Sequence, residues 1–158
     1  MRSRKKDKYM VKNIMKSTYH KLREKLIYDN GHGRGRIPWF ELFDTEIFIR
    51  MDRRRQRIIF NWLRFHYSGG VNLIPGCGTG SDLALLKILS NKIIGLDISE
   101  RAIKVARSLH GDIDLIIADA ECLPLRKCSI EMVFCKSIIH HLPMWGVQFL
   151  SEVNRCLK

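Results

Sequence analysis

The chain has 158 residues, 46% of them apolar and 28% charged, which suits one globular domain and excludes a low-complexity or collagen-like chain. No apolar run approaches the roughly 18 residues that span a bilayer, and no secretory-type stretch opens the sequence. We therefore expect a cytoplasmic protein without a transmembrane segment. The five cysteines form no C-x-x-C pair, so neither a disulfide framework nor a metal site is expected.

The net charge of +12 is unevenly distributed along the chain. Residues 1–66 contain 18 Lys and Arg against 7 Asp and Glu, whereas residues 67–158 contain 10 against 9. A basic segment of this kind suits RNA or an anionic surface, and it equally suits a solvated helix face. We divide the chain into a basic helical N-terminal extension, residues 1–68, and a second unit, residues 69–158.

The N-terminal extension is predicted to be mainly helical. Residues 1–30 indicate a basic tail that runs into an amphipathic helix. Residues 30–38 hold three glycines and a proline, which predict a loop. Apolar residues then recur at helical spacing from Phe43 to Leu63, which predicts one or two helices that end near Ser68-Gly69-Gly70.

From Val71 onward, short apolar runs alternate with helical patterns. The runs predict strands over residues 71–74, 92–96, 113–118 and 131–135. The patterns between them predict helices over residues 81–89 and 146–157, and a further helix with Ser99 as its N-cap. This alternation is typical of βαβ units, so we expect an α/β fold with a parallel sheet.

A glycine-rich loop, Gly76-Cys77-Gly78-Thr79-Gly80, lies between the first strand and the first helix of this unit. Glycines let the backbone turn sharply and approach a ligand, and the helix N-terminus offers N–H groups to an anion. Asp97 follows 21 positions after Gly76, at the end of the second strand, where a carboxylate can accept both hydroxyls of a ribose. Loop and acid together indicate an adenosine-containing ligand.

The second unit resembles the class I S-adenosylmethionine-dependent methyltransferases, particularly the branch that includes quinone-biosynthesis methyltransferases. The resemblance covers about residues 71–158 and rests on segments 73–80, 95–99, 118–124, 131–142 and 152–158, in that order. It implies a Rossmann-like parallel sheet of strand order 3-2-1-4 and S-adenosyl-L-methionine as the cofactor. It also implies that the chain is truncated, because the family's fold continues through later strands that would be absent here.

The resemblance further implies a cofactor site. Its residues, in chain order, would be Gly76, Gly78, Gly80, Asp97, Ile98, Asp119, Ala120 and Lys136. The glycine backbone would hold the methionine part, Asp97 the ribose and Ile98 one face of the adenine. Asp119 and Ala120 would hold the adenine edge, and Lys136 would lie near the cofactor. Asp97 also suits a carboxylate that simply leads a helix, and Asp119 a turn residue.

The sequence departs from the family at the first strand and offers few candidates for a catalytic base. The family usually has an acid two positions before the first glycine, where this chain has Ile74. His140 and His141 are the only candidates for a base, and such a pair is often structural. Nothing in the sequence indicates a bound metal.

The expected function is transfer of a methyl group to a small molecule, with tRNA as the second acceptor class. A non-catalytic cofactor-binding or RNA-binding remnant of a methyltransferase is one alternative. An NAD-dependent dehydrogenase is another, although its glycines normally run G-x-G-x-x-G and here they run G-x-G-x-G. Without later strands, the fourth strand would present an open edge through which the chain could self-associate.

Overall fold

The computed structural model describes residues 46–67, 69–90 and 92–158. The tail, helix and loop expected over residues 1–38 lie outside the described residues. Four parallel strands form one sheet in the order β3-β2-β1-β4, which confirms the predicted α/β class and strand order. The strands are β1 (Asn72–Pro75), β2 (Ile93–Asp97), β3 (Asp114–Ile117) and β4 (Met132–Val133).

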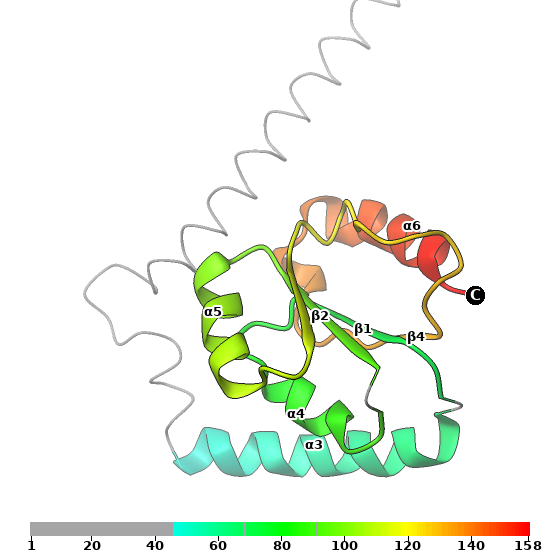
Figure 1. Ribbon diagram of the computed structural model, residues 1–158. Coiled ribbons are helices and arrows are strands. Elements are labelled where there is room, and N and C mark those ends of the chain that lie inside the picture. The colour runs from blue at the N-terminus through cyan, green and yellow to red at the C-terminus, as the bar shows by residue number, and fades with distance from the viewer. Residues whose placement is uncertain (1–45, 68, 91) are drawn as a thin grey trace, which may run out of the picture.

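Helices cover both faces of this sheet (Figure 1). On one face lie α3 (Glu46–His66), α4 (Ser81–Lys87) and α5 (Glu100–Leu109). On the other lies α6 (Val147–Cys156), reached through two short 3-10 turns, η1 (Ile139–His141) and η2 (Pro143–Gly146). From Glu46 onward, where the described residues begin, the predicted helical stretch is a single helix, α3.

Two apolar cores lie on either side of the sheet, because successive strand residues point to opposite faces. Ile74 packs with Leu63 of α3 and Leu86 of α4, whereas its neighbour Leu73 packs with Phe149 of α6. All four residues of β1 are buried, as a central parallel strand requires. Leu63 ties α3 into the core beneath the sheet.

The predicted N-cap of α5 is confirmed. The Ser99 hydroxyl accepts a hydrogen bond from the Ala102 N–H at 3.1 Å, and Ser99 is fully buried. The side chain therefore satisfies one of the N–H groups that the first turn of a helix leaves without a partner.

The strand β4 is shorter than the predicted residues 131–135, and β1 explains why. Leu73 and Val133 are register partners, and the Phe134 N–H donates to the Leu73 carbonyl at 2.9 Å. The next donor on this side of β1 would be residue 75, because parallel ladders use alternate residues. Pro75 has no N–H, so the ladder stops.

Leu157 and Lys158 lie beside Ile130, two residues before β4. Ile130 and Leu157 form an isolated parallel bridge, and the Lys158 N–H donates to the Ile130 carbonyl at 3.0 Å. Within the described part of the chain, no strand pairs with the outer edge of Met132–Val133. Leu157 pairs with Ile130, two residues before β4, so among the described residues Met132–Val133 is paired on the β1 side alone.

Candidate functional site

The glycine loop joins β1 to α4 at the carboxyl edge of the sheet, and its glycines have different surroundings. All three adopt positive φ angles, +66° at Gly76, +54° at Gly78 and +100° at Gly80. A Cβ on Gly76 would lie 2.8 Å from the Ile138 side chain, and one on Gly80 would lie 2.6 Å from the His110 ring. A Cβ on Gly78 would have open space, so Gly78 faces the opening of the loop.

Asp97, the last residue of β2, is bonded to this loop. Its Oδ2 accepts the Gly78 N–H and its Oδ1 accepts the Ser99 N–H, both at 2.9 Å. A carboxylate has about four acceptor sites, so accepting these two N–H groups does not preclude binding a ribose. Asp97 therefore leads into α5, as one interpretation of the sequence has it, and also faces the glycine loop; its contact with a ribose stays a prediction.

The segments after β2 and β3 also meet at this edge. The Ala118 N–H donates to the Asp97 carbonyl at 3.0 Å. The Asp119 Oδ1 accepts the Glu121 N–H at 2.9 Å, so Asp119 does form the turn that the sequence allowed. Ala120 is buried against the core on the α6 side, and Ile98 is partly exposed. The Ala120 side chain thus contributes to the core on the α6 side of the sheet.

An ion pair spans the two chain segments that flank the loop. Lys136, just beyond β4, places its Nζ 2.6 Å from Oδ1 of Asp82 in the first turn of α4. Both side chains are largely buried, at 20% and 10% exposed. Sequence reasoning identified Lys136 but missed Asp82. An acid in the first turn of the helix after a glycine loop was the available signal, because such acids complement the helix dipole.

The structure accounts for the departure at Ile74. Its side chain is buried in the core with Leu83 and Leu86 of α4, and an ionised carboxylate there would need a partner to offset its desolvation. Within the site, Asp82 is the carboxylate that lies nearest in the chain to the glycine loop. Position 74 serves packing, and Asp82 supplies the charge beside the loop.

The histidine pair lies on η1, directly after the segment that packs on the loop. The rings of His140 and His141 are 3.9 Å apart at 45°, so they contact each other. Ile138, which precedes them, is the residue that approaches Gly76. The pair thus follows, two and three positions later, the residue whose side chain meets the loop.

The thiol of Cys77, in the middle of the loop, is held neutral. Burial raises its pKa to about 12, and the nearby Asp97 carboxylate acts in the same direction. The thiolate is the nucleophilic form of cysteine, so Cys77 contributes packing and not nucleophilic chemistry. Among the described residues, no three His, Cys, Asp or Glu side chains are grouped to hold a metal ion.

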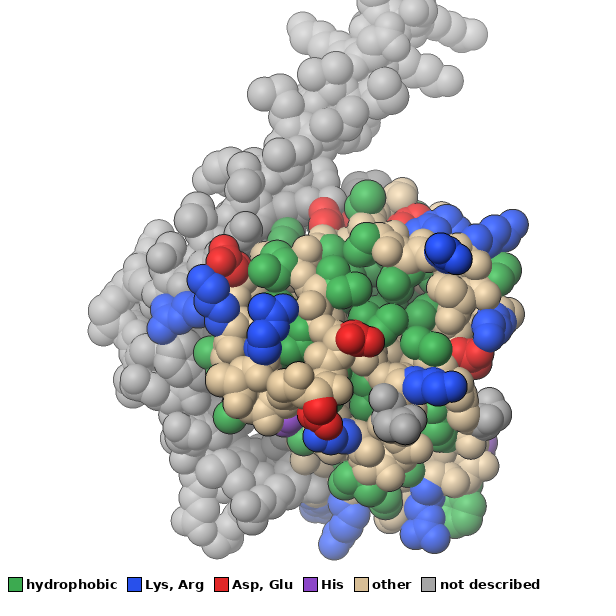
Figure 2. All heavy atoms as spheres, viewed as in Figure 1, with side chains coloured by type: hydrophobic (Ala, Val, Ile, Leu, Met, Phe, Trp, Pro, Cys, Tyr) green, Lys and Arg blue, Asp and Glu red, His purple; other side chains and the backbone are tan. Residues whose placement is uncertain are grey.

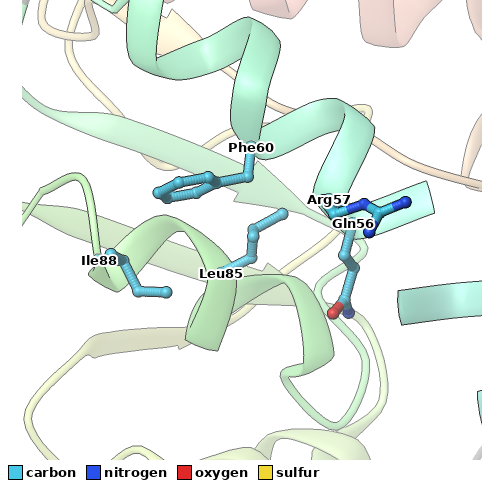
Figure 3. A pocket seen from close by; sticks show the side chains of 5 residues that line it. All are labelled: Gln56, Arg57, Phe60, Leu85 and Ile88. Atoms are coloured by element: carbon cyan, nitrogen blue, oxygen red, sulfur yellow. The ribbon is translucent and has the colours of Figure 1, made fainter. Parts of the chain in front are cut away.

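A hollow of about 230 Å³ lies between α3 and α4, apart from the loop. Figure 3 shows Phe60, Leu85 and Ile88 around it, with Gln56 and Arg57 at one side. The predicted site residues do not line it.

The described helices also include none that is both long and apolar enough to cross a membrane.

The fold and this edge together define a class of protein. A parallel sheet with a glycine loop after the first strand, and an acid at the end of the second, is the arrangement of a nucleotide-type cofactor domain. Residues 73–158, more than half of the chain, match the methyltransferase domain family. The chain belongs to this family, whose class I members depend on S-adenosylmethionine. This assignment replaces the dehydrogenase alternative.

Individual relatives agree with the assignment. A Mycolicibacterium smegmatis protein named as an S-adenosylmethionine-dependent methyltransferase is 30% identical over 106 residues, covering 66% of this chain and 40% of the relative. A protein from Methanococcus maripaludis, described as an S-adenosyl-L-methionine-dependent methyltransferase, superposes with a TM-score of 0.60 at 19% identity, over 75% of this chain and 56% of that one. A methyltransferase structure from Bacillus halodurans gives 0.56 at 25% identity, over 63% and 46%. The chain spans less than half the length of the curated relatives it matches.

Proposed function

We propose that this chain binds S-adenosylmethionine at the glycine loop and directs its methyl group to a small-molecule acceptor. The observation that carries the proposal is the junction of Gly78 and Asp97. It places a carboxylate and an open glycine side by side at the edge where βαβ sheets bind nucleotides. The residues fit the cofactor because open space at Gly78 lies next to the Asp97 carboxylate, which can accept hydrogen bonds from a ribose.

In this proposal Asp97 binds the ribose hydroxyls and the segments after β2 and β3 enclose the adenine. Ile98 covers one adenine face, and Asp119 with the backbone of Ala120 meets its edge. The ends of β2 and β3 are held together by the Ala118–Asp97 bond, which supports this arrangement. The loop backbone at Gly76, Gly78 and Gly80 approaches the methionine part.

Lys136 and Asp82 would complete the site as a pair of opposite charges beside the loop. The methionine part of the cofactor carries a carboxylate and an ammonium group, and this pair offers one partner to each. Asp82 would thus take the role of the acidic residue that the family usually has at the position of Ile74. Burial of both side chains strengthens these interactions, because water screens them less.

The cofactor, when bound, supplies a methyl group on a positively charged sulfur. The protein's main task is then to hold the acceptor in line with that methyl group, and a base is needed only if the acceptor must lose a proton. We propose His140 and His141 as candidates for that base. The small-molecule acceptor class follows from the resemblance, with tRNA as the second class.

A crossed binding experiment tests the site. S-adenosylhomocysteine and 5′-methylthioadenosine share the ribose, but only the first carries the amino-acid part. Asp97→Ala should weaken both about 30-fold, on the order of 2 kcal/mol for a lost charge-assisted pair. Lys136→Met should weaken only S-adenosylhomocysteine. Isothermal titration calorimetry gives the affinities directly.

The control is Asp114→Ala, which removes an exposed carboxylate at the start of β3, away from the loop. Because Asp97 also holds the Gly78 N–H, thermal unfolding of each variant must show that the fold persists; Asp97→Asn is the milder replacement. If Lys136→Met leaves Asp82 too costly to bury, the double variant with Asp82→Asn removes both charges. Equal binding by the wild type and Asp97→Ala would refute the assignment of Asp97 as the ribose-binding residue. Cofactor binding without methyl transfer to any acceptor would favour the non-catalytic alternative.

A further inference from the structure

The outward face of α3 carries large apolar side chains that the core does not use. Leu63 is 3% exposed and lies in the core, and Ile59 packs against it, so the inner face of the helix is accounted for. Ile58, Trp62 and Phe65 point elsewhere and are 61%, 59% and 77% exposed. Their spacing of four and three residues places them along one helix face. A surface helix normally needs one apolar stripe, and α3 has two.

Arginines border this outer stripe, and acids are absent from the same stretch. Residues 54–67 include four arginines and no Asp or Glu. Arg57 and Arg64, seven residues apart, follow one side of the stripe, and Arg55 lies on the other. All three are exposed, and the Arg64 guanidinium lies 5.1 Å from the centre of the Phe65 ring.

The stripe lies on the outside of the molecule. Figure 1 shows α3 beneath α4, on the side of the sheet opposite α6. Figure 2 shows Lys and Arg side chains next to hydrophobic ones along the lower edge, where Figure 1 places α3. The Trp62 ring stacks on the His66 ring, with centroids 4.2 Å apart and planes at 14°.

We propose that α3 docks the protein on an anionic lipid surface. Ile58, Trp62 and Phe65 enter the boundary between headgroups and acyl chains, and the flanking arginines contact the lipid phosphates. Helices that lie in a membrane surface combine these features: an apolar face with aromatic side chains, bordered by basic residues. Arginine stems can cover apolar surface while the guanidinium stays in water, which suits this border.

The stripe favours lipid over RNA as the occupant. Contact with RNA phosphates would use the arginines alone and leave the Ile58 side chain, which is 61% exposed, without a role. A lipid surface uses both the charge and the apolar side chains. The absence of acids over residues 54–67 provides the charge complementarity that an anionic surface requires.

The test is flotation of the whole chain with vesicles of phosphatidylcholine alone or mixed with phosphatidylglycerol. We expect binding to the mixed vesicles, weakened about ten-fold or more in Trp62→Glu/Phe65→Glu. The matched control is Leu109→Glu, because Leu109 of α5 is 65% exposed and lies on another helix. S-adenosylhomocysteine binding, followed by calorimetry, should be unchanged in both variants.

Three results would overturn the proposal. The first is no binding of the wild type to phosphatidylglycerol vesicles. The second is equal loss in Leu109→Glu, or full retention in the α3 double variant, which would assign binding to charge elsewhere in the chain. The third is binding of a random-sequence RNA that the α3 double variant abolishes while vesicle binding persists. Vesicle binding and cofactor binding are measured separately for each variant. A negative result for vesicle binding therefore leaves the proposed function unaffected.

Discussion

At the scale of single residues, the three loop glycines have different tasks. Gly76 and Gly80 are required by protein packing, since a side chain at either would meet Ile138 or His110. Gly78 faces open space and donates its N–H to Asp97, so we propose that its missing side chain leaves room for the cofactor. Stability and binding should therefore respond differently to substitutions in one short loop.

This difference gives a prediction for two alanine variants. Gly78→Ala should lower stability by only about 1–2 kcal/mol, the cost of a positive φ angle for a non-glycine residue, and should weaken S-adenosylhomocysteine binding strongly. Gly76→Ala should lower stability more, because the new methyl group also meets Ile138. Chemical denaturation and calorimetry measure the two quantities. Equal stability loss in both variants, with unchanged binding in Gly78→Ala, would contradict this division.

At the scale of elements, one arginine ties the segment after β3 to α6. Arg155 donates to the Leu123 and Leu125 carbonyls at 2.9 and 2.8 Å and pairs with Glu152 at 2.8 Å. Glu152 in turn accepts the Leu123 N–H at 2.9 Å. The segment that would enclose the adenine is therefore held from behind by the last helix.

We predict that Arg155→Met loosens this segment selectively. Amide hydrogen exchange should speed up over residues 119–130 and stay unchanged over α5, because the lost bonds go to the segment's backbone. Mass spectrometry of exchanged peptides provides the measurement. A uniform change along the chain, or none over residues 119–130, would show that the Arg155 contacts do not hold this segment locally.

Low pH should weaken the contacts between Arg155, Glu152 and the segment after β3 less than the Arg155→Met substitution does. The hydrogen bond from Arg155 holds the pKa of Glu152 below its ordinary value, with the Leu123 N–H contributing. A lowered folded-state pKa means that this stabilisation is fully present above the ordinary pKa of a glutamate. It is lost as the pH falls through the lowered value. Arg155 keeps its charge there, so its bonds to the two carbonyls remain.

At the scale of the whole molecule, the described strands leave two edges of the sheet unpaired, the outer edges of β3 and of β4, and the β4 edge lies next to the end of α6. Leu157 bridges Ile130 in parallel, so the backbone that leaves α6 already runs alongside the segment that leads into β4. A strand continuing in that direction would pair with Met132–Val133 and cover an edge that otherwise presents backbone donors and acceptors to other chains.

We predict that a strand added after Lys158 reduces self-association and raises the unfolding temperature. The residues that follow the matched region in the Mycolicibacterium smegmatis relative supply the extension. A version with prolines at alternate positions is the control, since it cannot donate to the ladder. Light scattering and thermal unfolding compare the chains. If the chain without extension is already monomeric at high concentration and unfolds cooperatively, the edge is not a site of association.

The local elements and the loop chemistry could be predicted from the sequence. Apolar runs predict the buried strands, and Ser99 is recognisable as a local N-cap. The spacing between the glycine loop and Asp97 identifies both as candidate site residues. The ligand-binding roles of all the site residues, the loop glycines and Asp97 included, stay predictions, because they depend on a ligand's position. All of these signals arise from neighbours in the sequence, which is why they survive without knowledge of packing.

Only the tertiary structure decided the features that join distant segments. The Lys136–Asp82 pair links residues 54 positions apart, and β4 ends where it does because Pro75 on another strand lacks a donor. The apolar periodicity of α3 indicated a helix, but only its packing showed that Leu63 faces the core while Phe65 faces outward. Sequence sets local conformation through short-range sterics and hydrogen bonding. Which side chains meet is set by packing between elements, which depends on the whole chain at once.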